Sequence, residues 1–488
     1  MKFPYLLILA LTAASARAQT HQAAPKAQAA EGRPFIEDSA CPVKIDSSFK
    51  TRCGYLVVPE NRQKPNSPKI RLPFIIVYSK NPHKHKDPLL FTTGGPGGSS
   101  LGWATGAPRH SLIQDRDCIA FEQRGTHYAL PALDGKALSD AIKEAYRKNL
   151  DKDSMMLVGV RRFKAELQAK GIDLAGYNTD ETVDDIDDLL IALRIDSVNL
   201  LGGSYSGGLM LDVLFKDPNR VRSLILDSPL PNFIPIDEDE PANFNEALKT
   251  LCTRVENDSA DHEKYGHLFT RFQQYMSSLE GRKMRVAYVE KGTTDTLHIG
   301  YTRNDLLDVV ENSFFNVSGM KDIPAMLIEI MQGHHEKYIR RTLNGIFNGT
   351  NGPSGMRLSV YCADQTAYHD ERILHQLYND LYPYMRGYHI NDVYRELCDC
   401  WQVPPIRRES KQPFYSAKPA LLGDGELDPA CRPLYIDMIH HYLPNSQRLL
   451  FHHRSHMVFF GQEMDAVFKA FLDNPWQPVP PVNDATAY

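Results

Sequence analysis

Short apolar runs alternate with longer segments whose apolar residues recur at helical spacing. The apolar runs predict buried strands. In chain order they are residues 55–58, 70–78, 89–93, 118–121, 198–201 and 221–226 and, much later, 420–423 and 448–451. Helices are predicted at residues 134–170, 179–193, 205–214 and 463–472. Strands that alternate with helices indicate an α/β fold with a doubly wound, mostly parallel sheet.

A long middle segment interrupts this alternation. Apolar residues such as Phe244, Leu248 and Leu251 recur there at helical spacing, and the only weak strand pattern is at residues 285–289. We therefore expect an inserted, mainly helical cap that divides the core of the fold in two. The expected parts are a first core segment at residues 37–232, the cap at 233–413 and a second core segment at 414–488.

The N-terminus has the pattern of an export signal. Lys2 is followed by an apolar stretch at residues 5–11, too short to span a bilayer, and by the small-residue cleavage pattern of residues 16–18. We expect cleavage near Ala18, a flexible leader at residues 19–36, and a secreted or periplasmic protein. The residue directly after the cleavage site is not a cysteine, so no lipid anchor is expected there. No later window reaches transmembrane length, so no membrane-spanning anchor is expected.

The composition is that of a globular protein and narrows the choice of partners. Hydrophobic residues make up 42% of the 488 residues, enough for one large domain with an insertion or for two domains. The formal net charge of −5 gives no reason to expect binding to nucleic acid or to an anionic membrane. A peptide or a small molecule is the expected partner.

Export would place the cysteines in an oxidising compartment, where disulfides form. Cys41 and Cys53 frame a short segment before the first predicted core strand and are expected to pair. Cys362 is expected to pair with Cys398 or Cys400. The pair Cys398 and Cys400 lacks the second ligand pair of a zinc site, so no metal is expected there. Cysteines without a predicted partner are Cys118, Cys252 and Cys431.

The strongest chemical pattern surrounds Ser204. A buried strand at residues 198–201 is followed by two glycines, Ser204 and a helix, with no spacer. This arrangement is typical of a nucleophile elbow, whose tight turn lifts a serine hydroxyl above the sheet. The start of the helix favours negative charge that forms nearby. Ser204 is therefore the candidate nucleophile.

One position departs from the elbow pattern. Gly202 lies two residues before Ser204, but Ser206 rather than glycine lies two residues after it. If Ser206 were the nucleophile, Gly208 would lie two residues after it, but Ser204 rather than glycine would lie two residues before it. Either choice therefore leaves one position without the expected glycine. Ser206 would already lie inside the helix, which favours Ser204 and leaves Ser206 as the alternative.

Two loops after the last predicted strands supply an acid and a base. Hydrolysis by a serine nucleophile requires a general base and a carboxylate that orients the base. In folds with a nucleophile elbow, these residues follow one another along the chain in the order serine, acid, histidine. Asp428 precedes a proline in the loop after residues 420–423, and His456 lies in the loop after residues 448–451. The alternatives are Asp424 and Asp227 for the acid and His452 and His453 for the base.

The glycine-rich loop at residues 94–100 follows a predicted strand. It lacks the Gly-Lys-Ser/Thr ending of a phosphate-binding loop and has no basic residue nearby, so a phosphate site is not favoured. Glycines let the backbone approach a substrate closely, which suits an oxyanion loop. The N–H groups of Tyr205 and of Gly95 or its neighbours would bind the oxyanion.

Five motifs occur in a characteristic order. They are Gly94-Gly-Pro-Gly-Gly98, Glu122-Gln-Arg-Gly125, Gly202-Gly-Ser-Tyr205, Gly425-Glu-Leu-Asp-Pro429 and Ser455-His456. On these motifs, residues 41–475 resemble the proline iminopeptidase and tripeptidyl-aminopeptidase-like family of α/β-hydrolases. The resemblance implies an α/β-hydrolase fold with an inserted cap, a triad of Ser204, Asp428 and His456, an oxyanion hole of Gly95 and Tyr205, and no cofactor.

The chain departs from that family at three motif positions. Thr93 stands where histidine is usual, Glu122 where aspartate is usual, and Ser206 where glycine is usual, and none of these changes removes a catalytic group. Tyr205 stands where the proline-specific branch usually carries tryptophan. This residue resembles the tripeptidyl branch and puts a strict preference for N-terminal proline in doubt.

The expected function is that of an exported serine aminopeptidase. Such enzymes are expected to hold the substrate's α-ammonium with cap carboxylates, and Glu238 and Glu240 in the acidic run at residues 237–240 are the candidates. The alternatives are hydrolysis of esters, lactones or amides of small molecules, and an inactive binding relative. Residues 334–336, His-His-Glu, are expected at the surface rather than on a metal.

Overall fold

The computed structural model describes residues 34–106, 111–258, 262–316, 319–349 and 354–487. The predicted signal sequence at residues 1–18 and the predicted leader up to residue 33 lie outside this part. The fold begins slightly earlier than predicted, because strand β1 (Phe35–Asp38) pairs antiparallel with β2 (Thr51–Pro59). Residues 35 and 36, expected in the leader, therefore belong to a sheet.

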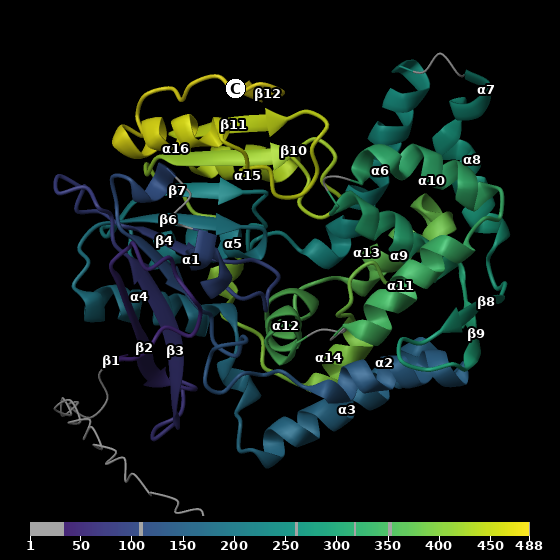
Figure 1. The fold of residues 1–488 in the computed structure, drawn as a ribbon, viewed down its shortest axis with the longest axis horizontal. Coiled ribbons are helices and arrows are strands. Elements are labelled where there is room, and N and C mark those ends of the chain that lie inside the picture. Colours follow the sequence, from purple (N-terminus) through teal and green to yellow (C-terminus); the bar gives the residue numbers. More distant parts are fainter. Residues whose placement is uncertain (1–33, 107–110, 259–261, 317–318, 350–353, 488) are drawn as a thin grey trace, which may run out of the picture. The chain divides into compact units, whose positions relative to one another are not determined.

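In the described chain, ten strands form one sheet with a parallel centre and antiparallel edges (Figure 1). The strand order is β1-β2-β3-β5-β4-β6-β7-β10-β11-β12. The further strands are β3 (Lys69–Val77), β4 (Leu89–Thr92), β5 (Cys118–Phe121), β6 (Val198–Gly203), β7 (Val221–Asp227), β10 (Ala420–Gly425), β11 (Ser446–Phe451) and β12 (Ala485–Ala487). The strands from β5 to β11 are parallel, which confirms the predicted fold class.

Helices cover both faces of this sheet. One face packs against α4 (Thr179–Leu193), α5 (Tyr205–Lys216) and α15 (Leu434–Tyr442), and the other against α1 (Leu101–Gly106) and α16 (Glu463–Asp473). Neighbouring side chains of β6 point to opposite faces, so Leu200 packs in the first apolar cluster and Leu201 in the second. Burial on both faces explains why the central strands are continuous apolar runs.

Between β7 and β10 the described chain is mainly helical, apart from a hairpin of β8 (Met284–Val289) and β9 (Thr296–Tyr301). The weak strand pattern at residues 285–289 is β8. The helices are α6 (Ile236–Asp258), α7 (His262–Tyr265), α8 (Leu268–Ser278), α9 (Arg303–Phe314), α10 (Ile323–Met331), α11 (Glu336–Asn348), α12 (Gly355–Val360), α13 (Glu371–Gln376) and α14 (Arg395–Trp401), with π-helical turns at Tyr361–Thr366 and Leu377–Leu381. Short 3-10 turns occur at Ser111–Ile113, Leu174–Gly176, Met320–Asp322, Pro383–Met385 and Arg408–Lys411. None of these helices is both long and apolar enough to cross a membrane.

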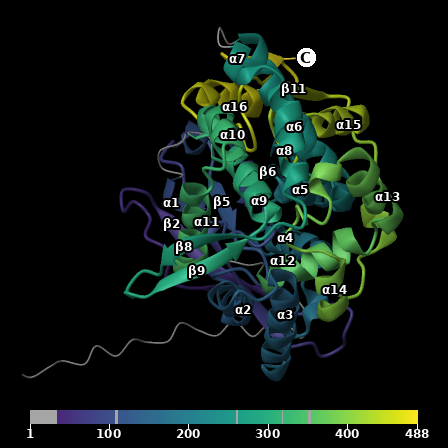
Figure 2. The same cartoon turned by 90° about the vertical axis from the view of Figure 1, so that its right-hand side faces the viewer.

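Two helices from the first half of the chain pack against this inserted segment. Helices α2 (Lys136–Lys148) and α3 (Lys152–Ala169) share one apolar cluster with α6, α8, α9, α11 and α14. In Figure 2, α3 lies between α2 and α14. Phe163 of α3, for example, lies with its ring 5.6 Å from that of Trp401 on α14. The helical layer that contains this cluster is therefore built from two separate stretches of sequence, α2 with α3 and the segment between β7 and β10.

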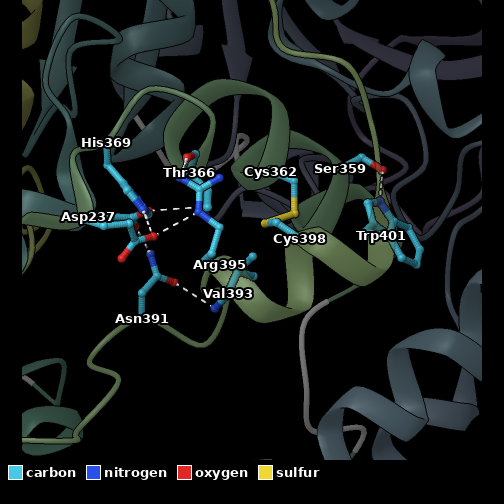
Figure 3. Close-up of a disulfide and its surroundings, with 11 residues drawn as sticks. Asp237, Ser359, Cys362, Thr366, His369, Asn391, Val393, Arg395, Cys398 and Trp401 are labelled. Atoms are coloured by element: carbon cyan, nitrogen blue, oxygen red, sulfur yellow. Dashed lines mark hydrogen bonds and ion pairs between the residues drawn. A yellow bond between two sulfur atoms is a disulfide. The ribbon is translucent and has the colours of Figure 1, made fainter. Parts of the chain in front are cut away.

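Two disulfides are present in the described chain. Cys41 pairs with Cys53, as predicted, and Cys362 pairs with Cys398 (Figure 3). The choice between Cys398 and Cys400 is decided by the helix α14, on which residues two apart point to different sides. Cys398 is buried toward Cys362, whereas Cys400 is partly exposed and unpaired.

The expectation that residues 334–336 lie at the surface is wrong for His335. Its ring is buried between Tyr275 and Tyr301, whose hydroxyls lie 2.8 and 3.1 Å from the two ring nitrogens. The contact is made by helices and strands that are distant in sequence, so local spacing could not indicate it. No three His, Cys, Asp or Glu residues of the described ranges are grouped to hold a metal ion.

Replacing Cys362 and Cys398 together by serine should lower the free energy of unfolding by about 4 kcal/mol. The disulfide closes a loop of 36 residues, and the unfolded chain regains that conformational entropy when the bond is absent. Urea unfolding measures the difference. Cys400→Ser is the matched control and should change stability by less than about 0.5 kcal/mol; an equal loss in this control would contradict the assignment.

Candidate active site

Ser204 lies at the turn between β6 and α5. Its φ of 54° and ψ of −131° are outside the regions that L-residues favour. Three backbone hydrogen bonds hold this conformation. The Ser204 N–H donates to Asp227 O at 2.9 Å, and the Ser204 carbonyl accepts from Gly207 N at 2.8 Å and Leu230 N at 2.9 Å. The backbone therefore has the strained turn that a nucleophile elbow requires.

The neighbours of this turn explain how it tolerates a second serine. A Cβ on Gly202 would lie 2.4 Å from the Ser206 carbonyl oxygen, so only glycine fits there. Ser206 is fully buried, and its hydroxyl is hydrogen-bonded to Thr92 Oγ1. Ser204 lines a large cavity and Ser206 does not. Of the two serines, Ser204 has the geometry of a nucleophile.

His456 and Asp428 are joined by a hydrogen bond. The Nδ1 atom of His456 lies 2.7 Å from Asp428 Oδ2. The other carboxylate oxygen of Asp428 accepts from the N–H groups of Ala430 and Cys431, each at 2.8 Å, so the carboxylate has one orientation. His456 lines the same cavity as Ser204. The structure thus brings the favoured base and acid together, with His456 at the wall of that cavity and Asp428 bonded to its ring.

The surroundings of His456 favour an imidazole that can accept a proton. Burial alone would lower its pKa, but the charge and hydrogen bond of Asp428 and the charge of Asp227 outweigh burial and raise the pKa above its usual value. The ring of Phe315 packs edge-on against the imidazole at 5.6 Å. Asp428 thus orients the imidazole of His456 from one side, and the ring of Phe315 covers it on another.

The two other acid candidates are buried close by and have different partners. Asp227 accepts from the N–H groups of Val458 at 2.7 Å and Phe459 at 3.1 Å, and so holds the loop that follows the histidine. Burial raises the pKa of Asp227 to about 6. Burial and the adjacent Asp428 carboxylate raise the pKa of Asp424 well above its usual range.

The two other base candidates lie outside the cavity lining. His452 is hydrogen-bonded to Glu426 Oε2 at 3.2 Å and to Thr486 Oγ1 at 2.8 Å. His453 Nδ1 lies 2.8 Å from a guanidinium nitrogen of Arg254. Both rings are engaged at the end of β11 and do not reach toward Ser204.

The glycine loop passes close to Ser204. A Cβ on Gly94 would lie 2.9 Å from the Cβ of Ser204, so a larger residue would displace the loop. Gly95, the next residue, lines the cavity. The N–H of Tyr205 belongs to the first residue of α5 and has no acceptor within the helix. Both residues named for an oxyanion hole thus adjoin Ser204.

A cavity of about 1310 Å³ lies above the carboxyl edge of the sheet. Ser204, His456 and Gly95 line it from the sheet side. Glu240 of α6 and Glu311 of α9 line it from the inserted segment. The cavity therefore combines a serine with acidic side chains that face it from the opposite wall.

The two glutamates face this cavity without an ion pair to any described residue. The Oε2 atom of Glu240 is buried and has no hydrogen-bond partner there. Burial, with the charge of Asp237 adding to it, raises the pKa of Glu240 to about 8. Burial and the charge of Glu240 raise the pKa of Glu311 well above its usual value. Two such carboxyl groups are suited to receive a cation.

Glu238, the other acidic candidate from the sequence, does not line this cavity. Its Oε1 atom accepts from the Asp370 N–H at 2.6 Å. Two further charged residues that the sequence did not indicate line the cavity: Glu311, and Arg357 with its guanidinium near the glycine loop. A charged residue on an amphipathic helix normally faces solvent, so the sequence contains no signal that separates these two from surface residues.

Replacing Glu240 by glutamine should stabilise the ligand-free protein at pH 8 and not at pH 4. The folded-state pKa of about 8 exceeds the ordinary value of 4.5, so between these pH values the folded state binds more protons and loses stability as pH rises. Glu240→Gln removes that loss, a gain of about 1–3 kcal/mol at pH 8. Urea unfolding of both proteins at the two pH values measures it, and equal differences at both would contradict the burial of an unpaired carboxyl.

Several curated proteins are similar in sequence. Tripeptidyl aminopeptidase of Streptomyces lividans is 27% identical over 214 residues, which cover 41% of this chain and 40% of that protein. The tripeptidyl aminopeptidase of Streptomyces coelicolor gives the same identity over 39% of its length. The chain thus matches about two fifths of each of these relatives. Serine protease Hip1 of Mycobacterium tuberculosis is 22% identical over 405 residues, 76% of this chain and 74% of that protein.

Solved structures of hydrolases are similar at low identity. Proline iminopeptidase of Mycobacterium smegmatis is 15% identical, with a TM-score of 0.42, over 86% of this chain and 98% of that one. A serine hydrolase of Cycloclasticus zankles is 13% identical, with a TM-score of 0.37, over 91% of this chain and 100% of that one.

One family model matches the chain. The model, described as alpha/beta hydrolase fold, matches residues 87–462, which is most of the chain and includes Ser204, Asp428 and His456. The match begins just before β4 and ends just before α16. The chain therefore belongs to the α/β-hydrolase family.

Proposed function

We propose that this protein is an exported serine peptidase that releases short peptides from free N-termini. The observation that carries the proposal is a cavity lined by Ser204 and by His456, whose ring is bonded to Asp428, and lined from the inserted segment by two unpaired glutamates. Ser204, His456 and Asp428 are suited to acyl transfer, and the two glutamates are suited to bind the substrate's α-ammonium. An aminopeptidase requires both in one cavity.

The triad acts by proton transfer and covalent catalysis. Ser204 Oγ attacks the scissile carbonyl carbon while its proton passes to Nε2 of His456. Asp428, bonded to Nδ1 at 2.7 Å, holds the ring and stabilises the imidazolium. The imidazolium then protonates the leaving amine. Water, deprotonated by His456, releases the acyl group and restores the serine.

The oxyanion of the tetrahedral intermediate would form beside the start of α5. The Tyr205 N–H and the Gly95 N–H are the proposed donors. Neither group needs to move far, because the elbow fixes Tyr205 and the glycine loop passes within contact distance of Ser204. Donors that are in place before the reaction stabilise developing charge without a cost of reorganisation.

Glu240 and Glu311 are the proposed acceptors of the substrate's α-ammonium. In the empty cavity each carboxyl has a raised pKa, because burial is not offset by a cation. A bound ammonium would supply that cation and favour the ionised carboxylates. Glu238 is not assigned this role, since it binds the Asp370 backbone instead.

The size of the cavity supports release of a short peptide rather than of one amino acid. Its volume of about 1310 Å³ exceeds the roughly 300–1,000 Å³ of pockets that hold drug-sized ligands. The relatives named tripeptidyl aminopeptidase and serine protease Hip1 support a peptide substrate. Tyr205 in place of tryptophan supports the tripeptidyl rather than the proline-specific type.

The proposal of export rests on the predicted signal sequence at residues 1–18 and on the cysteines. The pairs Cys41–Cys53 and Cys362–Cys398 are disulfides, which persist in oxidising compartments. Cell fractionation with an antibody to the mature protein tests the location.

Ser204→Ala should abolish labelling by a fluorophosphonate probe and lower kcat by about 10⁴-fold or more. Ser206→Ala is the matched variant, because Ser206 lies two residues away but is buried against Thr92. It should keep labelling and most of the activity. Gel detection of the probe and hydrolysis of a tripeptidyl chromogenic amide measure the two effects. Activity that survives in Ser204→Ala would refute the nucleophile.

Glu240→Gln should raise KM for free-amine tripeptidyl amides by about 10- to 100-fold, because the ammonium loses its charged partner. For the same amides with a blocked N-terminus, and for short-chain esters, KM should change little. Glu246→Gln, on the same helix but outside this cavity, is the control. Equal effects on free and blocked substrates would remove the proposed ammonium site, and a wild-type protein active only on esters would favour the small-molecule alternative.

A further inference from the structure

The glycine loop is held from the core at both of its ends. Thr93 O accepts from the Gln123 side chain at 2.7 Å. The Glu122 carboxylate accepts from Ser99 Oγ at 3.0 Å and from the Ser100 N–H at 2.8 Å. Glu122, which stands where the family usually has aspartate, thus fixes the end of the loop that enters α1. Within the loop, the Gly98 N–H also donates to the Gly94 carbonyl at 3.3 Å. These contacts leave the Gly95 carbonyl to be held by another partner.

The contact at Gly95 comes from the inserted segment. Arg357, on α12, donates from Nη1 to the Gly95 carbonyl oxygen at 2.6 Å. The start of α12 also packs on the loop, because a Cβ on Gly97 would lie 2.6 Å from Ser354 Oγ. One arginine therefore joins the inserted segment to the residue that is proposed to bind the oxyanion.

Arg357 is itself held in one orientation. Its Nε donates to Asp392 Oδ1 at 2.7 Å, its Nη2 donates to Asn391 Oδ1 at 3.2 Å, and the guanidinium lies 4.4 Å from the centre of the Tyr361 ring. All five N–H groups of a guanidinium lie in one plane, so these partners fix the direction of Nη1. Arg357 is therefore fixed by residues of the inserted segment and holds the glycine loop through Nη1; we call this arrangement the clamp.

Asn391 extends this clamp into a buried polar network. Its Nδ2 donates to Asp237 Oδ1 at 3.2 Å, and Asp237 Oδ2 lies 2.7 Å from His369 Nδ1 and accepts from Thr366 Oγ1 at 3.2 Å (Figure 3). The Cys362–Cys398 disulfide lies beside it. Asp237, from the acidic run of the sequence, therefore supports the clamp rather than the cavity wall.

We propose that Arg357 is a positioning residue for the oxyanion hole: by gripping the Gly95 carbonyl from the inserted segment, it keeps the Gly95 N–H aimed at the position beside Ser204 where the oxyanion forms. The inference rests on the proposed function, because it requires acyl transfer at Ser204. It assigns to the inserted segment a part in the chemical step as well as in enclosing the substrate.

The physical reason is the freedom of the loop without this contact. Gly95 has a φ of 121°, in a region open mainly to glycine, and its backbone rotates with little steric hindrance. The Gly95 N–H belongs to the peptide group before its Cα, and the Gly95 carbonyl to the group after it. Because both ends of the loop are held, rotation of the carbonyl away from Arg357 has to be compensated at neighbouring backbone bonds, including those that aim the N–H. A charge-assisted hydrogen bond from a fixed guanidinium opposes that rotation.

A second role for Arg357 must be separated from this one. Its charge also acts on Glu240 and Glu311, where it opposes the rise of each carboxyl pKa. If that were its role, changing Arg357 would alter binding of the substrate ammonium and leave blocked substrates unaffected. A positioning role instead lowers kcat for every substrate that forms a tetrahedral intermediate.

The experiment compares Arg357→Gln and Arg357→Lys with the wild type on a free-amine tripeptidyl amide and on its N-blocked form. We expect Arg357→Gln to lower kcat about 10- to 100-fold on both substrates, with KM within about 3-fold, since loss of one oxyanion donor costs 10²–10³ and misalignment costs less. Arg357→Lys should recover only part of kcat, because an ammonium lacks the planar fork. Added guanidinium at millimolar concentration should partly restore Arg357→Ala.

Arg340→Gln is the matched control. Arg340 lies on α11 of the same inserted segment, donates to the Ala287 carbonyl at 2.9 Å and pairs with Glu336 at 2.7 Å, but does not touch the glycine loop. It should keep wild-type kcat. A fall in kcat for free-amine substrates alone, an equal fall in Arg340→Gln, or no fall in Arg357→Gln would overturn the inference. A wild-type protein whose Ser204 does not react with a fluorophosphonate would instead overturn the proposed function.

Discussion

The backbone of Ser204 has a positive φ that L-residues adopt at a cost of about 1–3 kcal/mol, and the site depends on its being held there. The cost is offset by hydrogen bonds to Asp227, Gly207 and Leu230, which come from the next strand, the next helix and the chain that leaves for the inserted segment. The parallel pairing of β6 with β7 therefore supports the turn at Ser204, because it brings the Asp227 carbonyl to that turn.

The charged side chains that line the cavity also depend on contacts between distant parts of the chain. Glu240 and Glu311 line the cavity and form no ion pair with a described residue, and burial makes their ionised carboxylates unfavourable. Arg357 is the nearby cation, but its N–H groups are used by Asp392, Asn391 and Gly95. The cavity lining thus offers two carboxylates to a positive group, while Arg357 is engaged with the glycine loop.

The sequence predicted the sheet well because its central strands are buried on both faces and appear as uninterrupted apolar runs. It was less informative where an element depends on a distant partner. Strand β1 becomes a strand only by pairing with β2, and His335 is buried only because Tyr275 and Tyr301 close around it. Helices α2 and α3 were expected within the first core segment, and the structure packs them against the inserted helices through residues such as Phe163.

The sequence by itself determined the residues of the elbow and the order in which Ser204, Asp428 and His456 follow their strands, because each is fixed by local chain geometry at the end of a strand. Only the tertiary structure decided which carboxylates face the cavity, that Cys362 pairs with Cys398, and that Arg357 reaches Gly95. Arg357 and Gly95 are 262 positions apart, and both Glu238 and Glu240 lie on one helix turn. Contacts of this kind depend on how helices pack, and helical spacing in the sequence does not specify which neighbour a polar side chain will meet.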